Sequence, residues 1–196
     1  MDDAEIWTHI DAQRTALADL LDTLTAEQWA APSLCEGWSV RDVAVHLTHS
    51  TAPWPRMAFE AVRSGFRFNA MVSRLARQDP RPPDEIVAAL RAMVGVRRRP
   101  PGTAVADPLT DVLVHTQDIA VPLGIEREMP PAPAVIAAQR LWSMGFPFHA
   151  RRRFAGMALQ ATDADFAVGS GRPVSAPIRD IVLALSGRNS AVLPRV

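Results

Sequence analysis

The sequence predicts a mainly α-helical protein that ends in a small α+β module. Apolar residues recur at spacings of three, four and seven through most of residues 1–150, which is the pattern of amphipathic helices. Prolines divide these stretches, and beyond Arg153 the apolar residues alternate instead. We therefore expect a helical bundle over residues 1–150 and a short β-hairpin and helix module over residues 151–196.

Capping signals and breaks set the expected helices. Thr25 with Gln28 and Ser39 with Asp42 have the spacing of capping boxes, in which each side chain bonds the backbone of the other. Asp107 followed by proline is a further start signal. The expected helices cover residues 4–24, 39–49, 56–78, 84–97 and 107–121, and residues 130–133 lead into a shorter helix that ends at residue 142.

The expected β-hairpin follows from alternating apolar residues on both sides of a turn. Phe154, Met157 and Leu159 precede the polar turn 162–164, and Phe166 and Val168 follow it. Residues 176–185 then predict a final amphipathic helix.

Composition excludes several classes of protein. The 21 cationic side chains, all arginine, balance 21 acidic ones, so the chain lacks the basic excess of a nucleic-acid binder. Lysine and tyrosine are absent, which excludes Schiff-base chemistry and tyrosine acid–base chemistry. No apolar run reaches the ~18 residues typical of a membrane span. The single cysteine and the acidic start at Met1 are typical of a cytoplasmic protein, where we expect this chain.

Two of the expected helices carry polar residues at the same spacing. One has Asp42, His46 and His49, and the other has Asp111, His115 and Asp118, at positions i, i+4 and i+7. Each trio occupies one side of its helix. If the two sides meet inside the bundle, their imidazoles and carboxylates form a metal site.

Simpler interpretations exist for both helices. Apolar residues cover the other side of helix 107–121, so its polar edge is explained equally by contact with water. His46 borders apolar positions and is explained equally by a buried hydrogen bond to Asp42. Cys35, before a Gly-Trp turn, reads as a half-buried structural residue rather than a nucleophile. Spacing does not choose among these interpretations.

The local sequences resemble the DinB-like metal-binding bundles, and within them the mycothiol-dependent maleylpyruvate isomerase-like family. The matching stretches begin at Trp29 and are residues 32–47, 111–119, 122–124, 161–169 and 185–188. The resemblance implies a four-helix core that holds one divalent ion, usually zinc. It implies His46, Asp111 and His115 as the metal ligands. Asp111 stands where the family pattern has glutamate, so its helix lies closer to the ion or its carboxylate binds through water.

The resemblance also implies a low-molecular-weight thiol, of the mycothiol type, as a second cofactor. A bound Zn²⁺ stabilises a thiolate near neutral pH. We therefore expect a thiol-dependent isomerase or S-transferase that acts on a small electrophile. His49 and Asp118 are the candidate bases or orienting residues, and each could equally be a surface residue. Trp54, between two prolines, is a candidate for the pocket lining, and Arg151, in an arginine run, is a candidate for anion binding.

A non-catalytic metal- or ligand-binding bundle is the alternative function, and a purely structural bundle is a third. The expected partners are a small thiol and an electrophile, without nucleic acid or membrane. A homodimer is the common default for such proteins.

Overall fold

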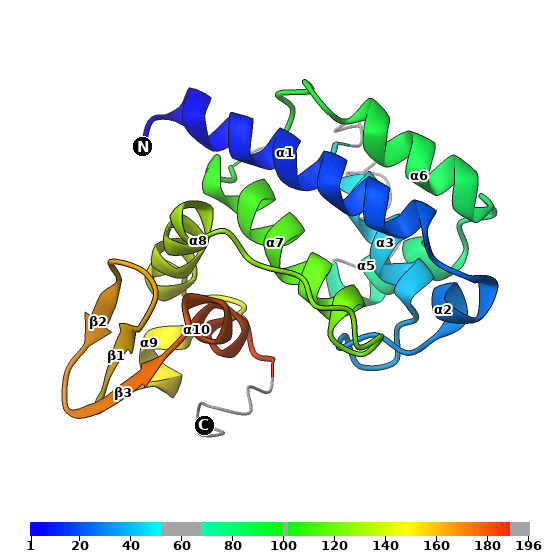
Figure 1. Ribbon diagram of the computed structural model, residues 1–196. Coiled ribbons are helices and arrows are strands. Elements are labelled where there is room, and N and C mark those ends of the chain that lie inside the picture. The colour runs from blue at the N-terminus through cyan, green and yellow to red at the C-terminus, as the bar shows by residue number, and fades with distance from the viewer. Residues whose placement is uncertain (52–67, 100–101, 189–196) are drawn as a thin grey trace.

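The computed structural model describes residues 1–51, 68–99 and 102–188. The chain is mainly helical with a small sheet near its C-terminus, as Figure 1 shows, and this confirms the predicted fold class. The first part of the expected helix 56–78 lies outside the described residues; its end is helix α5 (Phe68–Arg77). None of the described helices combines the length and apolarity that crossing a bilayer requires.

Four helices enclose the first part of the core. Helix α1 (Asp3–Asp22) packs against α6 (Pro83–Ala92) and α7 (Ala106–Ala120), and α3 (Val40–Thr48) packs against the same two helices from the other side. Helix α5 adds to the outside of α3. Buried aliphatic side chains fill the ring between these helices; they include Leu17, Leu21, Val43, Leu47, Ile86, Leu90, Val112 and Ile119.

Capping starts two helices where the sequence predicts, but the expected start at Asp107 is wrong, because α7 begins at Ala106 with Val105 as its N-cap. Ser39 and Asp42 form a complete capping box at the start of α3, and Thr25 and Gln28 form another at the start of the short α2 (Ala26–Ala30). The 3-10 turn η1 (His49–Thr51) follows α3 directly. Helix α6 ends at Ala92 rather than at the expected residue 97, and Gly95, with φ of +82°, lies in the turn beyond it.

A second core joins the rest of the chain to α1 and α7. It contains the first apolar residues of α1, one side of α7, and buried residues of α8 (Pro131–Ser143), α9 (Ala150–Arg153), the sheet and α10 (Ile178–Leu185). Helix α8 lies between α7 and α10 and packs on both. Helix α7 contributes to both cores, so its position is fixed from two sides.

The C-terminal sheet contains the expected hairpin and one strand that was not expected. Strands β1 (Met157–Ala161) and β2 (Ala167–Gly169) pair antiparallel. Strand β3 (Arg172–Ala176) pairs parallel with the other edge of β1, giving the order β2-β1-β3. The prediction was incomplete because β3 is mostly exposed and lacks apolar alternation.

Two glycines let the chain cross from one edge of this sheet to the other. A Cβ atom at Gly169 would lie 2.2 Å from the carbonyl oxygen of Met157, and one at Gly171 would lie 2.3 Å from that of Gly156. Both glycines also have positive φ. Residues 169–171 therefore form a tight crossing that requires glycine.

Candidate metal centre

Helices α3 and α7 bring the predicted ligands together. His46 lies in the last turn of α3, and Asp111 and His115 lie one turn apart on α7. Because Val43 and Val112 hold the apolar sides of the two helices in the bundle core, the adjoining polar edges face each other.

The donor atoms of these three side chains lie within 4.8 Å of one another. The Oδ1 atom of Asp111 is 3.6 Å from Nε2 of His46 and 3.4 Å from Nε2 of His115. Two donors bound to one tetrahedral zinc ion at 2.0–2.1 Å lie about 3.3 Å apart. The two measured distances are close to that spacing, so the residues fit a divalent cation with small adjustments.

The contacts of the His46 ring contradict the interpretation of His46 as a buried histidine bonded to Asp42. The described hydrogen bonds of the Asp42 carboxylate go to the backbone and hydroxyl of Ser39, not to His46. The imidazole instead packs edge-on against His115, with ring centroids 4.9 Å apart, and against Trp38 at 5.5 Å. His46 therefore belongs to the cluster with α7.

Asp111 is charged in this setting. Burial alone would raise the pKa of its carboxyl group, but hydrogen bonds and charge from His115 and His46 outweigh burial and hold the pKa well below its usual range. The side chain is still 30% exposed. An ionised, accessible carboxylate beside two imidazoles is a suitable ligand set for zinc.

The other nitrogen of His115 faces a buried carboxylate. Its Nδ1 atom lies 2.8 Å from Oδ2 of Asp118, whose side chain is fully buried. A carboxylate only accepts hydrogen bonds, so Nδ1 carries a proton. A cation bound at Nε2 would replace the proton that this nitrogen shares with Asp111. Such a carboxylate–histidine pair orients metal-binding histidines. The polar edge of α7 is therefore not simply a solvated one.

Asp118 is also held by an arginine from the end of the chain that the structure describes. Arg188 donates from Nε to Oδ1 at 3.0 Å and from its NH2 group to Oδ2 at 2.6 Å. These two parallel bonds are the strong bidentate form of the arginine–carboxylate pair. Burial raises the pKa of Asp118, but His115 and Arg188 outweigh it and the pKa lies well below its usual range.

Cys35 completes this second group of polar side chains. Its thiol donates to Oδ2 of Asp118 at 3.1 Å, and it lies 3.8 Å from Nδ1 of His115. Ser33 fixes the surrounding loop through hydrogen bonds to the backbone of Cys35 and Trp38, and the Leu34 amide donates to the Asp118 carbonyl. Cys35 is half-buried, as expected, but it has polar partners that its sequence neighbours did not indicate.

Cys35, His115 and Asp118 also have metal-ligand spacing, but their space is already taken by a cation. The NH2 group of Arg188 lies 3.4 Å from the Cys35 sulfur, in addition to its contact with Asp118. A metal ion there would be repelled by the guanidinium. The geometry therefore favours the group of His46, Asp111 and His115 as the metal centre.

The remaining predicted site residues lie apart from these contacts. Asp79 holds the ring of His49, with 3.4 Å between Oδ2 and Nε2, and Arg81 holds the same carboxylate through two hydrogen bonds. Arg151 lies on α9 and donates to the carbonyl of Trp142. Trp54 lies outside the described residues.

Sequence reasoning did not single out two arginines beside the centre. Arg188 was noticed only as part of a matching stretch, because its partners Asp118 and Cys35 are distant in the sequence. Arg14 is a cation on the apolar side of α1 and is buried. An arginine inside an apolar stripe is itself a signal, because such a charge requires partners.

Residues 10–100 match the family model described as the mycothiol maleylpyruvate isomerase N-terminal domain. The match covers a little less than half of the chain. The predicted family resemblance is therefore confirmed, and the matched segment includes His46. No curated protein matches the sequence.

Two solved structures share the fold of this chain. A crystal structure of the mycothiol-dependent maleylpyruvate isomerase is 14% identical, covers 100% of this chain and 96% of that one, and gives a TM-score of 0.67. A crystal structure of a histidine-to-alanine mutant of the mycothiol-dependent maleylpyruvate isomerase is 15% identical, with the same coverage and a TM-score of 0.58. At these identities, the likeness concerns the fold.

Proposed function

We propose that this chain is a metal- and thiol-dependent enzyme that isomerises a small electrophile or transfers a thiol to it. One observation carries the proposal. His46, Asp111 and His115 converge from two helices with donor atoms within 4.8 Å, and they lie partly open to solvent. A structural zinc site is closed by four protein ligands, whereas three ligands leave a position for an exogenous group.

The three side chains would hold a divalent ion, for which zinc is our proposal because imidazole and carboxylate donors suit it. When bound, the ion stabilises a thiolate relative to its thiol near neutral pH. A thiolate that adds to an activated double bond permits rotation, and one that displaces a leaving group is transferred. The mycothiol-dependent relatives support a mycothiol-type thiol in this role.

The chain's own residues would prepare this chemistry. Asp118 fixes the tautomer and orientation of His115, so we propose it as a positioning residue. His49 follows His46 by less than one helical turn, and Asp79 holds its ring. We propose His49 as the group that accepts a proton at the edge of the site. For Trp54 and Arg151, contact with the thiol or substrate stays a prediction.

The bundle over residues 1–150 and the module over residues 151–196 are proposed as the units of organisation. We also propose a cytoplasmic enzyme that uses a small thiol and an electrophile as partners. Homodimer formation is part of the same proposal and is measured by light scattering.

Elemental analysis of protein purified without a histidine tag tests the proposal first. We expect about one zinc ion per chain, lost in His46→Ala. Conjugation or isomerisation of a model electrophile with an added thiol then tests catalysis, with and without a chelator. Turnover that the chelator abolishes supports the enzyme. One zinc ion per chain without any turnover would favour a non-catalytic metal-binding protein. The absence of metal would contradict both the enzyme and the metal-binding protein.

His49→Gln tests the proposed proton acceptor separately. We expect this variant to keep its zinc, because His49 is not a ligand, and to lose most of its turnover. Unchanged turnover would exclude His49 from the reaction.

A further inference from the structure

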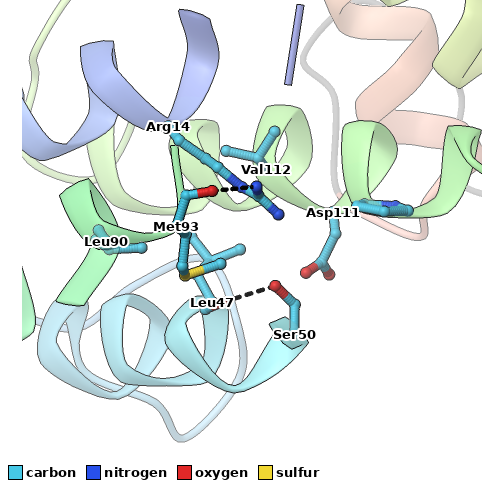
Figure 2. Close-up of a pocket in the computed structure, with 8 residues that line it drawn as sticks. Arg14, Leu47, Ser50, Leu90, Met93, Asp111 and Val112 are labelled. Carbon is cyan, nitrogen blue, oxygen red and sulfur yellow. Dashed lines mark hydrogen bonds between the residues drawn. The ribbon is translucent and has the colours of Figure 1, made fainter. Parts of the chain in front are cut away.

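A small pocket adjoins the metal centre on the side of α1. Its polar lining comes from Arg14, Ser50 and Asp111, and apolar side chains such as Leu90 and Val112 complete it. Figure 2 shows the guanidinium of Arg14, the hydroxyl of Ser50 and the carboxylate of Asp111 around the same space. The pocket has room for about one water molecule. Its occupant is therefore a single small molecule or ion.

Arg14 brings hydrogen-bond donors to this pocket that lack a described partner. Its side chain is 3% exposed, and its described hydrogen bonds use a single nitrogen, NH1, which donates to the carbonyls of Met93 at 2.7 Å and Val96 at 3.3 Å. Among the described residues, no group accepts a hydrogen bond from Nε or NH2. Because a buried donor without an acceptor costs free energy, these N–H groups indicate a further partner in the pocket.

The other two polar groups of the pocket are acceptors. The imidazoles of the metal centre approach Oδ1 of Asp111, so Oδ2 is the oxygen available to the pocket. Ser50 donates its proton to the carbonyl of Leu47 at 2.9 Å, as the dashed line in Figure 2 marks, so its Oγ atom offers lone pairs. A water molecule that accepts from Arg14 and donates to Asp111 and Ser50 makes three hydrogen bonds, the number typical of buried water.

The charges of the pocket disfavour the other small occupants. A monatomic cation would be repelled by the guanidinium of Arg14, and a monatomic anion would be repelled by the carboxylate of Asp111. Burial is the main cause that lowers the pKa of Arg14, and the charge of Asp111 is among the causes that oppose it, so the two charges act on each other across this space. A neutral molecule that both accepts and donates hydrogen bonds suits both charges.

We propose that one water molecule in this pocket links Arg14 to Oδ2 of Asp111, and that Arg14 thereby acts as a positioning residue for this metal ligand. The inference rests on the proposed function and deepens it, because it assigns a support to the carboxylate ligand of the same centre. Carboxylates that bind a metal are in turn held by hydrogen bonds. Among the described residues, the two imidazoles are the only groups that pair with Asp111 directly, so its outer oxygen depends on the water.

The water also keeps the guanidinium of Arg14 away from the ion. No described ion pair joins Arg14 to Asp111, whereas Arg188 contacts Asp118 directly at 2.6 Å. Arg14 is itself held by the carbonyl of Met93, in the turn that follows α6. The water therefore connects Asp111 on α7 to α1 and to the end of α6, without placing a cation against the donor atoms of the metal centre.

High-resolution crystal structures of the zinc-free and the zinc-loaded protein test the water directly. We expect one water molecule at about 2.7–3.2 Å from both a nitrogen of Arg14 and Oδ2 of Asp111, in both structures. Absence of this water from either structure, or a direct bond between Arg14 and Asp111, would overturn the proposal.

Variants of Arg14, titrated with zinc against a chromogenic chelator, test the positioning role. Arg14→Met removes every donor, and we expect zinc affinity to fall by about tenfold or more. Arg14→Lys keeps the charge and a donor for the carbonyl of Met93 but loses the other nitrogens, so we expect a stable fold and a severalfold loss. Arg91→Gln is the matched control, because Arg91 is an exposed arginine that joins α6 to Asp19 and Asp22 of α1. Wild-type affinity in both Arg14 variants would contradict the positioning role.

The cobalt-loaded protein separates positioning from folding. Its visible absorption bands depend on the geometry of the ligands, so we expect Arg14→Lys to shift them and Arg91→Gln to leave them unchanged. Unshifted bands in Arg14→Lys would mean that Arg14 supports the fold alone and would overturn the proposal. Absence of zinc uptake by the unaltered protein would count against the proposed function, even with the water in place. Normal zinc uptake without the water would count against this inference alone.

Discussion

The two nitrogens of His115 face different surroundings. On the Nε2 side lie His46 and Asp111, which are partly exposed, and among the described residues no hydrogen bond or ion pair joins either of them to an arginine. On the Nδ1 side lie Asp118 and Cys35, and Arg188 already bonds to both. Both groups have the spacing of metal ligands. Residue type and spacing alone therefore do not identify a cation site. The positions of the neighbouring cationic side chains also decide whether a metal ion can bind.

The two sides also depend on each other. Asp118 on the buried side holds a proton of His115 at Nδ1, so Nε2 is the nitrogen that would bind a cation on the open side. Arg188 in turn fixes Asp118. Arg188, at the end of the described residues, thus supports His115 on α7 through the carboxylate of Asp118.

Removing a ligand on the open side should have the largest effect. For His46→Ala we expect zinc affinity to fall by more than about a hundredfold, above the range typical of supporting residues. Titration against a chromogenic chelator measures it. His49→Gln, three residues further along the chain in η1, is the matched control, and an equal loss there would contradict the assignment of ligands.

Changing the carboxylate on the buried side should have the next largest effect. Asp118→Asn keeps the shape but no longer holds His115 in one tautomer, so we expect zinc affinity to fall by about ten- to a hundredfold. The same titration measures this. Affinity equal to that of the unaltered protein would show that the buried side does not support the open one.

Removing the guanidinium of Arg188 should mainly lower the stability of the protein. Arg188→Gln leaves Asp118 without its buried cation, and we expect the free energy of unfolding to fall by about 3 kcal/mol. Urea denaturation measures it. Zinc affinity should fall by less than in Asp118→Asn, because His115 keeps its own contact with the Asp118 carboxylate. A larger fall would contradict the expectation that Asp118 matters more to zinc binding than Arg188.

The charge of Asp118 predicts that the free energy of unfolding depends on pH. Its pKa is lower in the folded protein than in the unfolded chain, where it is about 3.9. The stability from this charge is therefore fully present above about pH 4 and is lost as pH falls toward the folded pKa. Urea denaturation between pH 6 and pH 3 measures it, and the loss should be smaller in Asp118→Asn. Equal losses in both proteins would contradict the charged pair.

The smallest effect is expected at the cysteine. Cys35→Ser keeps a donor for Asp118, so we expect unchanged zinc stoichiometry and a change in stability of under about 1 kcal/mol. Elemental analysis and thermal unfolding measure these two quantities. Loss of zinc in this variant would mean that the ion binds on the Nδ1 side.

The parts of this structure that could be predicted are those set by residues close together in the sequence. The capping boxes at Thr25 and Ser39 start their helices as expected, because both partners of each box lie within four residues. The spacing on the two helices likewise gave His46, Asp111 and His115 as a candidate group. Strand β3 was missed because its pairing with β1 depends on distant backbone contacts at two glycines.

The supporting residues could not be predicted for the same reason. Arg188 lies 70 positions from Asp118 and 153 from Cys35, and no periodic pattern links residues so far apart. The burial of Asp118 follows from two cores that meet on α7, which the periodicity of one helix does not reveal. Spacing and the family resemblance together identify the candidate ligands, whereas the residues that support them depend on the whole fold.

The coordination of zinc tests the contrast between the two sides most directly. X-ray absorption spectroscopy of the zinc-loaded protein, prepared without added thiol, measures the ligand atoms and their distances. The account predicts nitrogen and oxygen ligands at about 2.0–2.1 Å and no sulfur. A sulfur ligand at about 2.3 Å would place the ion on Cys35 and contradict the account.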